Sequence, residues 1–144
     1  MRALLDVNVL IALLDEAHIH HQLAMSWLTN NIELGWASCP MTQNACIRIL
    51  SQPAYPNTVP AAMVAERLAE ACKHSAHTFW ADSVSLLELD TIIWKHILGS
   101  RQVTDAYLLV LAVMNHGRFV TFDQSISLPA VVGAKTEHLV VLDV

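Results

Sequence analysis

The sequence carries little charge. Charged residues make up 15% of its 144 residues, against the roughly 25% usual for soluble domains. The 8 Lys and Arg residues are outnumbered by 13 Asp and Glu residues, so the net charge is −5. A negative chain has no general electrostatic attraction to nucleic acid. A role on nucleic acid would therefore need a local group of basic side chains together with bound cations.

Long hydrophobic runs are missing as well, although 54% of the residues are hydrophobic. The stretch Val7–Leu14, which includes Asn8, is far shorter than the ~20 residues that span a bilayer. Asp6 interrupts the apolar N-terminus too early for a signal peptide. We expect no contact with a membrane and a cytoplasmic location. The apolar excess over the roughly 45–50% usual for soluble domains is expected to cover an interface with a partner.

Cysteine is scarce and is not arranged in metal-binding pairs. Cys39, Cys46 and Cys72 are odd in number and form no CxxC motif. This spacing excludes a disulfide framework and gives no zinc-binding pattern. We expect three reduced thiols in the core.

Short apolar strands alternate with helical patterns along the chain, and no linker or repeat interrupts them. We expect strands near residues 2–5, 33–38, 78–80, 119–122 and 139–142. We expect helices over residues 7–14, 18–28, 41–50, 61–72, 85–98 and 104–116, with Thr104 capping the last one. This alternation predicts an α/β fold with a mainly parallel central sheet of four or five strands between layers of helices. We expect residues 1–144 to form one domain, because that length suits a single core.

Polar oxygens follow the apolar runs at four places. Asp6, Asp105 and Asp123 each stand where a strand ends or a helix begins, and Gln43 stands near the start of the third helix. Taken singly, each aspartate could be a helix cap, a first-turn carboxylate or a turn residue. Strand ends and helix starts gather at one edge of a parallel sheet, however. We therefore expect these side chains to converge as oxygen ligands for Mg²⁺, or for Mn²⁺ in its place.

The segments around these residues resemble the PIN-domain ribonucleases, and among them the VapC-like toxins of bacterial toxin–antitoxin pairs. The matching segments are Leu4–Leu10, Cys39–Asn44 with Arg48–Ser51, Val103–Leu108 and Val120–Asp123. They run nearly from one end of the chain to the other, and their order and spacing are specific. The resemblance implies a compact PIN-like α/β/α sandwich, a homodimer, a cognate antitoxin protein, and one or two divalent ions. It also implies cleavage of an RNA phosphodiester by metal-activated water.

One position departs from the family pattern. The second motif of the family usually supplies an acid where this chain has Gln43. An amide oxygen can ligate Mg²⁺, but it brings no charge and cannot act as a base. The sequence is thus compatible with two functions: an endoribonuclease toxin impaired by Gln43, or an inactive homologue that binds RNA or an antitoxin without cutting.

Several other side chains are weaker candidates. Asn8 and Thr121 could orient the aspartates, and Arg48 and Arg101 could contact phosphates. His18, His20 and His21 have no acid or cysteine to complete a transition-metal site, so we interpret them as residues at a helix start. A phosphatase of the haloacid-dehalogenase type would need an acid where Asn8 stands, which argues against that chemistry.

Overall fold

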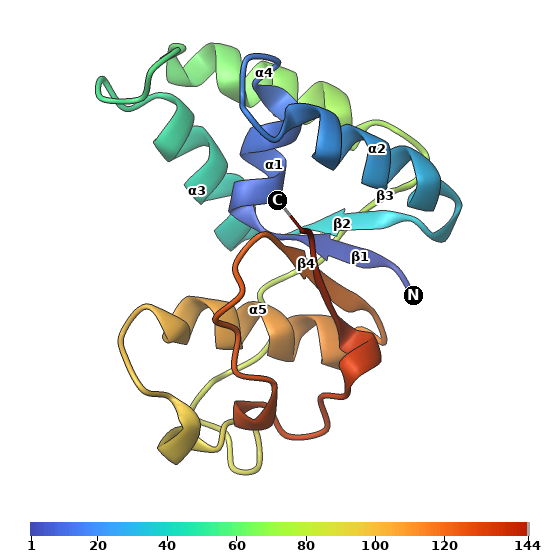
Figure 1. Cartoon of the computed structure of the whole chain (residues 1–144), viewed down its shortest axis with the longest axis vertical. Helices are drawn as coiled ribbons and strands as arrows, with labels where there is room; N and C mark the ends of the chain where they lie inside the picture. The colour runs from blue at the N-terminus through green and yellow to red at the C-terminus, as the bar shows by residue number, and fades with distance from the viewer. Residues whose placement is uncertain (144) are drawn as a thin grey trace.

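A five-stranded, fully parallel sheet forms the centre of the molecule, as the computed structural model describes it for residues 1–143 (Figure 1). Its strands are β1 (Ala3–Leu5), β2 (Trp36–Ser38), β3 (His77–Phe79), β4 (Arg118–Thr121) and β5 (Leu139–Val141). They lie in the order β3-β2-β1-β4-β5. The predicted α/β class and the parallel sheet are confirmed.

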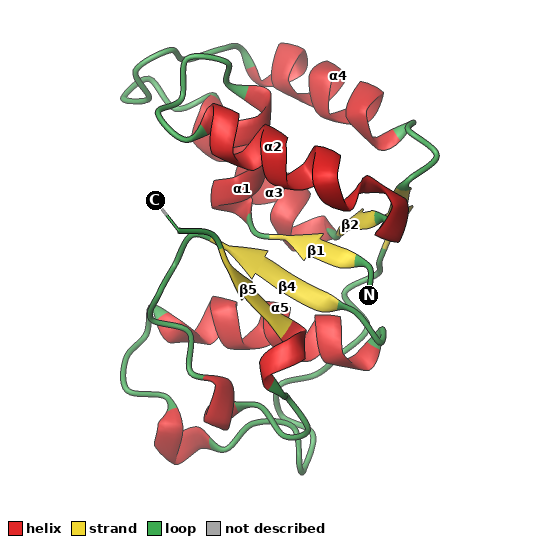
Figure 2. Ribbon diagram, turned by 45° about the vertical axis from the view of Figure 1, so that its right-hand side comes forward, coloured by secondary structure: helices red, strands yellow, loops and turns green. Residues whose placement is uncertain are grey.

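Helices cover both faces of the sheet (Figures 1 and 2). They are α1 (Val7–Leu14), α2 (His21–Asn31), α3 (Pro40–Leu50), α4 (Ala61–Cys72) and α5 (Gln102–Met114), with short 3-10 helices η1 (Ile32–Leu34), η2 (Trp94–His96), η3 (Leu128–Ala130) and η4 (Thr136–His138). The first four α-helices lie on one side of the sheet and α5 lies on the other. The arrangement is the three-layer α/β/α sandwich that the sequence predicted.

Side chains of the strands alternate between the two helical layers, as the pleat requires. Leu5 and Val120 belong to the core beneath α1 to α4, whereas Leu4 and Phe119 belong to the core beneath α5. Both cores are fully closed at the central strands β1 and β4. A sheet buried on both faces leaves only its strand ends for polar chemistry.

The predicted helix over residues 85–98 is wrong. This segment is a loop that ends in η2, and Ile92 pairs with Val131 in an isolated antiparallel bridge. Leu87 and Leu98, which lie within the predicted helix, are 87% and 85% exposed. Val84 and Leu86 instead pack against the α5 core from an extended chain. The helix start was misplaced as well, since α5 begins at Gln102 and Arg101 rather than Thr104 precedes it.

No helix among residues 1–143 combines the length and the apolar character that crossing a bilayer demands.

Candidate acidic centre

The strand order reverses between β1 and β4. β1 is followed along the chain by β2 on one side, while β4 and β5 extend the sheet on the other side. In open α/β sheets, ligands bind outside the carboxyl ends of the strands at this point. Asp6 immediately follows β1, and Asp123 lies two residues after the end of β4. The topology therefore brings these two aspartates to the place where a binding site is expected.

Asp6 is held in a single orientation by two hydrogen bonds. Its Oδ1 accepts from the backbone N–H of Val7 at 2.7 Å, which caps α1, and its Oδ2 accepts from the Thr121 hydroxyl at 2.6 Å. Asp6 is 4% exposed and Thr121 is fully buried. The predicted capping role is thus correct, and it leaves the remaining lone pairs of the carboxylate for a ligand.

The Thr121 hydroxyl also organises the chain after β4. Its Oγ1 accepts from Asn8 Nδ2 at 3.3 Å and from the backbone N–H of Asp123 at 3.0 Å. The other end of the Asn8 amide, Oδ1, accepts from the N–H of Phe122 at 3.4 Å. Asn8 and Thr121 therefore join the start of α1 to the end of β4. The hydrogen bonds of Thr121 also position Asp6 and Asp123.

Asp123 closes a tight turn. Its Oδ1 accepts from the backbone N–H and the hydroxyl of Ser125, at 2.8 and 2.7 Å. These bonds favour the ionised carboxylate, so the pKa of Asp123 lies below its ordinary value. The turn role expected from the sequence is present, and it also fixes the carboxylate beside Asp105.

The surroundings of Asp105 disfavour the ionised form of its carboxyl group. It lies in the first turn of α5 and is half-buried. Burial raises its pKa to about 7, and the negative charges of Asp6 and Asp123 add to the shift. Burial also raises the pKa of Asp6, against the hydrogen bonds from Thr121 and Val7. The structure thus brings three aspartates close enough to repel one another, and we call Asp6, Asp105 and Asp123 the acidic centre.

Gln43 is engaged elsewhere. It lies in the first turn of α3, and its Nε2 donates to Ser38 Oγ at 2.9 Å. Ser38 Oγ lies 2.8 Å from His77 Nε2, so the serine hydroxyl can donate onward to the imidazole. Among residues 1–143 no hydrogen bond joins Gln43 to the acidic centre. The three predicted aspartates come together, whereas Gln43 is bound to Ser38 at the end of β2.

The acidic centre offers the oxygen ligands that a divalent ion prefers, but its side chains alone do not complete the coordination of an ion. Burial and the nearby carboxylate charges raise the pKa values of Asp6 and Asp105, so the centre would gain from a neutralising cation. Within the described part of the chain, no group of three or more His, Cys, Asp or Glu residues already has metal-binding geometry. Mg²⁺ usually keeps several waters and takes only one or two carboxylates directly. The three aspartates fit that mode of binding, in which water completes the shell.

The two basic candidates are both exposed to solvent. Arg48 is exposed on α3, and Arg101 is exposed just before α5. Arg48 lines a shallow groove that also includes Asn44, Asp82 and Thr104. Asn44 and Asp82 were missed by the sequence analysis. Asp82 lies three residues after the end of β3, so a search of the residues that follow each strand would have found it.

The three histidines behave as residues of a helix start. His21 opens α2 and its Nδ1 lies 2.7 Å from the carbonyl oxygen of Ala12. His18 Nδ1 accepts from the N–H of His20, whose ring packs against Phe122. Within residues 1–143 they complete no metal-binding group.

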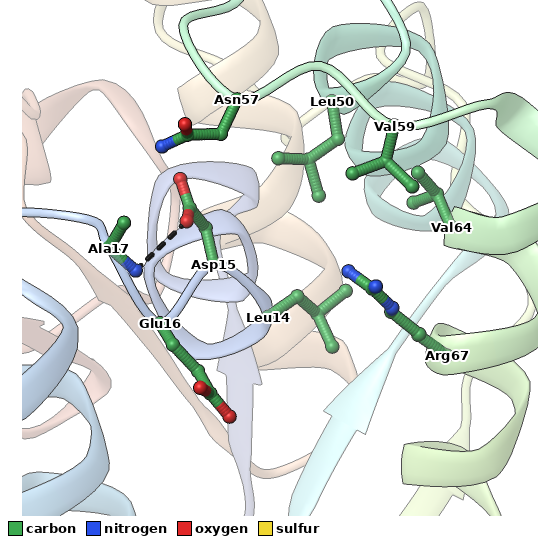
Figure 3. Close-up of a pocket in the computed structure, with 9 residues that line it drawn as sticks. All are labelled: Leu14, Asp15, Glu16, Ala17, Leu50, Asn57, Val59, Val64 and Arg67. Atoms are coloured by element: carbon green, nitrogen blue, oxygen red, sulfur yellow. Dashed lines mark hydrogen bonds between the residues drawn. The ribbon is translucent and has the colours of Figure 1, made fainter.

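A separate cavity of about 480 Å³ lies at the far end of α1 from Asp6 (Figure 3). Leu14, Leu50 and Val64 form apolar walls, and the Arg67 side chain extends from α4 toward Leu14. Nearby, the Tyr55 hydroxyl donates to Asp15 Oδ2 at 2.5 Å and fixes the loop between α3 and α4 to the end of α1. This cavity has no part in the acidic centre.

Thr121→Val tests the role of the buried hydroxyl. Valine keeps the shape of the side chain but removes the donor to Asp6 and the acceptor for Asn8 and Asp123. Leaving such buried groups unpaired costs about 1–3 kcal/mol, so the unfolding free energy in urea should fall by that amount. Thr29→Val, at an exposed site on α2, is the control and should change stability little. Equal effects of the two substitutions would contradict the assigned role.

The pKa of Asp105 predicts an unusual dependence of stability on pH. Between its ordinary value of 3.8 and about 7, the folded protein keeps a proton that the unfolded chain has lost. The unfolding free energy should therefore decrease as the pH rises through this window. In EDTA, Asp105→Asn should remove most of this decline, whereas Asp90→Asn, at an exposed carboxyl, should not. Denaturation curves taken from about pH 4 to about pH 8 measure the difference, and parallel profiles for all three proteins would refute it.

The relatives of the chain agree with the geometry. No protein-family model matches it. Ribonuclease VapC44 of Mycobacterium tuberculosis strain H37Rv is 53% identical over 142 residues, which cover 99% of this chain and 100% of the relative. Ribonuclease VapC38 of the same strain is 42% identical over 125 residues, 86% of each chain, and ribonuclease VapC39 is 40% identical over 129 residues, 88% of this chain and 92% of the relative. Identity of this extent, together with the α/β/α sandwich and its three aspartates at the switch in strand order, shows that the chain belongs to the VapC-like family of PIN-domain ribonucleases.

Proposed function

We propose that the chain is a Mg²⁺-dependent endoribonuclease that acts in the cytoplasm as the toxin of a toxin–antitoxin pair. The observation that carries this proposal is the meeting of Asp6, Asp105 and Asp123 at the switch in strand order. The names of its relatives, each called a ribonuclease, support the reaction. Mn²⁺ is expected to substitute for Mg²⁺, because both prefer oxygen ligands.

The three aspartates have distinct parts in this proposal. When bound, Mg²⁺ supplies an activated water for attack on the phosphodiester and offsets the charge that develops on the phosphate oxygens. Asp6 offers a carboxylate already oriented by Thr121 and Val7. Asp123, whose pKa is lowered by Ser125, offers one that is ionised at neutral pH. Asp105 holds a proton up to about pH 7 and has to release it to become a ligand, so ion binding should strengthen as the pH rises.

A second function has specific support in Gln43. An inactive homologue would keep the acidic centre for binding but lack the fourth carboxylate. The amide of Gln43 is neutral and already donates to Ser38. Such a protein would bind RNA or an antitoxin without cutting.

Gln43→Glu separates the two functions. A carboxylate at position 43 cannot donate to Ser38, but the Ser38 hydroxyl can turn and donate to it, while His77 Nε2–H donates to Ser38 in place of accepting. The substitution adds one negative charge close to the strand ends and should strengthen ion binding. We expect cleavage of total cellular RNA at limiting Mg²⁺ to rise by about tenfold, equivalent to about 1.4 kcal/mol, and toxicity to rise in cells without the antitoxin.

The control combines Gln43→Glu with a second substitution that removes one carboxylate of the acidic centre. Asp6→Asn or Asp105→Asn in the Gln43→Glu background should abolish the gain, because one restored carboxylate cannot hold the ion alone. Cleavage rates are compared across a Mg²⁺ series for all four proteins. Equal, fully metal-dependent rates for the chain as it stands and for Gln43→Glu would show that position 43 is not the missing acid. No cleavage by any of them would favour the binding protein.

We propose further that the protein forms a homodimer and binds a small antitoxin chain. Exposed apolar side chains support an interface, among them Met63 on α4, 47% exposed, and Trp94 in η2, 49% exposed. Trp27, also expected at an interface, is half-buried beneath the guanidinium of Arg118. The apolar walls of the cavity beside α1 and α4 are a suitable place for an antitoxin side chain (Figure 3). A basic antitoxin residue reaching the acidic centre would neutralise it.

Light scattering at micromolar concentration tests the assembly. The protein alone should have the mass of two chains, and Trp94→Ser should shift it toward one chain if η2 lies in the interface. Lys95→Ser, next to it, serves as the control. A monomer at every micromolar concentration would contradict the dimer.

A further inference from the structure

A shallow groove with both apolar and polar lining lies next to the start of α5, which carries Asp105, and has no part in the chemistry described above. It has a volume of about 420 Å³ and lies between the first half of α3, the loop after β3 and the start of α5. Thr104 lines it, and the next residue along the chain is Asp105. The groove is therefore one residue away from the acidic centre along α5, close enough for a nucleotide next to one bound at Asp105.

The groove presents three different polar groups. Arg48 and Asn44 project from α3, four residues apart and hence on the same face of the helix. Asp82 faces them from the loop after β3. Within residues 1–143, only Lys73 and Glu70 approach within 4.0 Å as an ion pair, so Arg48 and Asp82 do not neutralise each other. All three side chains are exposed to solvent.

Asp82 is exposed but lies near the neighbouring elements. Burial raises the pKa values of the Cys39 thiol, just after β2, and of Tyr107 on α5, and the negative charge of Asp82 adds to both shifts. Asp82 is therefore close to the junction of these elements. Met41 and Ala45, both half-buried, give the groove an apolar floor.

This set of groups matches a single unpaired nucleotide. A guanidinium binds phosphate oxygens, an apolar floor accepts the face of a base, and an amide and a carboxylate can read the edge of the base. A carboxylate only accepts hydrogen bonds. Guanine presents two adjacent N–H donors on its Watson–Crick edge, the ring N1–H and the exocyclic amine, whereas the other three RNA bases present a single N–H or a single amine.

We propose that this groove holds the nucleotide next to the scissile phosphate of single-stranded RNA and selects guanine, with Asp82 accepting from the base edge and Arg48 binding a neighbouring phosphate. The proposal rests on the proposed ribonuclease function for its substrate class. Asn44 supplies a further donor and acceptor to the same base. The net charge of −5 leaves little general affinity for RNA, so selection would depend on these placed groups.

Binding is measured separately from cleavage. The probes are fluorescent single-stranded oligouridylates that carry one central guanine, adenine, cytosine or uracil. Fluorescence anisotropy in EDTA, with Asp105→Asn present throughout to prevent cutting, gives the four affinities. We expect the guanine probe to bind about tenfold more tightly than the others, the size of one good bidentate contact.

Matched variants identify the groups responsible. Asp82→Asn should remove the preference for guanine, whereas Asp90→Asn, at an exposed aspartate outside the groove, should keep it. Arg48→Gln should weaken all four probes by a similar factor, whereas Arg67→Gln on α4 should not. Equal affinities for the four probes, or a guanine preference that survives Asp82→Asn, would overturn the assignment to Asp82. Unchanged binding by Arg48→Gln would overturn the phosphate contact.

A cleavage assay keeps this proposal distinct from the proposed function. The Gln43→Glu protein is incubated with the same probes and Mg²⁺, and the fragment ends are sequenced. Cleavage beside guanine supports both proposals. Cleavage without regard to guanine overturns the groove and leaves the ribonuclease standing. Guanine-selective binding without cleavage supports the groove and overturns the ribonuclease.

Discussion

The candidate site depends on one buried hydroxyl. Thr121 donates its proton to Asp6 and accepts from Asn8 and from the backbone of Asp123. These bonds join the end of β4 to the end of β1 and the start of α1, the three pieces of chain that meet at the switch in strand order. With one donor and two acceptor sites, a hydroxyl has no bonding capacity left over. Its neighbours therefore have a single arrangement in which every buried polar atom is paired.

This arrangement keeps together groups that repel one another. Asp105 lies near two other carboxylates in a half-buried place, and its pKa of about 7 measures the penalty for ionising there. A protein selected for stability alone would replace it with a neutral residue. Binding of a cation at the acidic centre would remove that penalty, and a basic side chain of a partner would do so as well. An ion and a basic partner would thus relieve the same electrostatic penalty at the acidic centre.

The strands and most helices were predictable because their signals are local. Apolar runs of strand length, Asp6 as a cap and the periodic pattern of α5 each follow from a few neighbouring residues. The segment over residues 85–98 misled because its leucines have helical spacing, while its true conformation is set by contacts of Val84 and Leu86 with the distant α5 core. Convergence of the three aspartates followed from topology. The orientation of the Gln43 amide could not be predicted in this way, because the amide donates to Ser38. Ser38 in turn contacts His77, which lies 39 positions further along the chain.

The hydrogen bond between Thr121 and Asp6 spans 115 positions of the chain. Contacts of such long range form late, because the loop that they close carries a large entropic penalty. During synthesis, β1 and its capped helix emerge well before their partner strand β4. A nascent chain that lacks β4 has neither Thr121 nor Asp123 and cannot assemble the acidic centre. The order of elements along this polypeptide therefore delays assembly of the acidic centre until β4 and the residues just after it have been made.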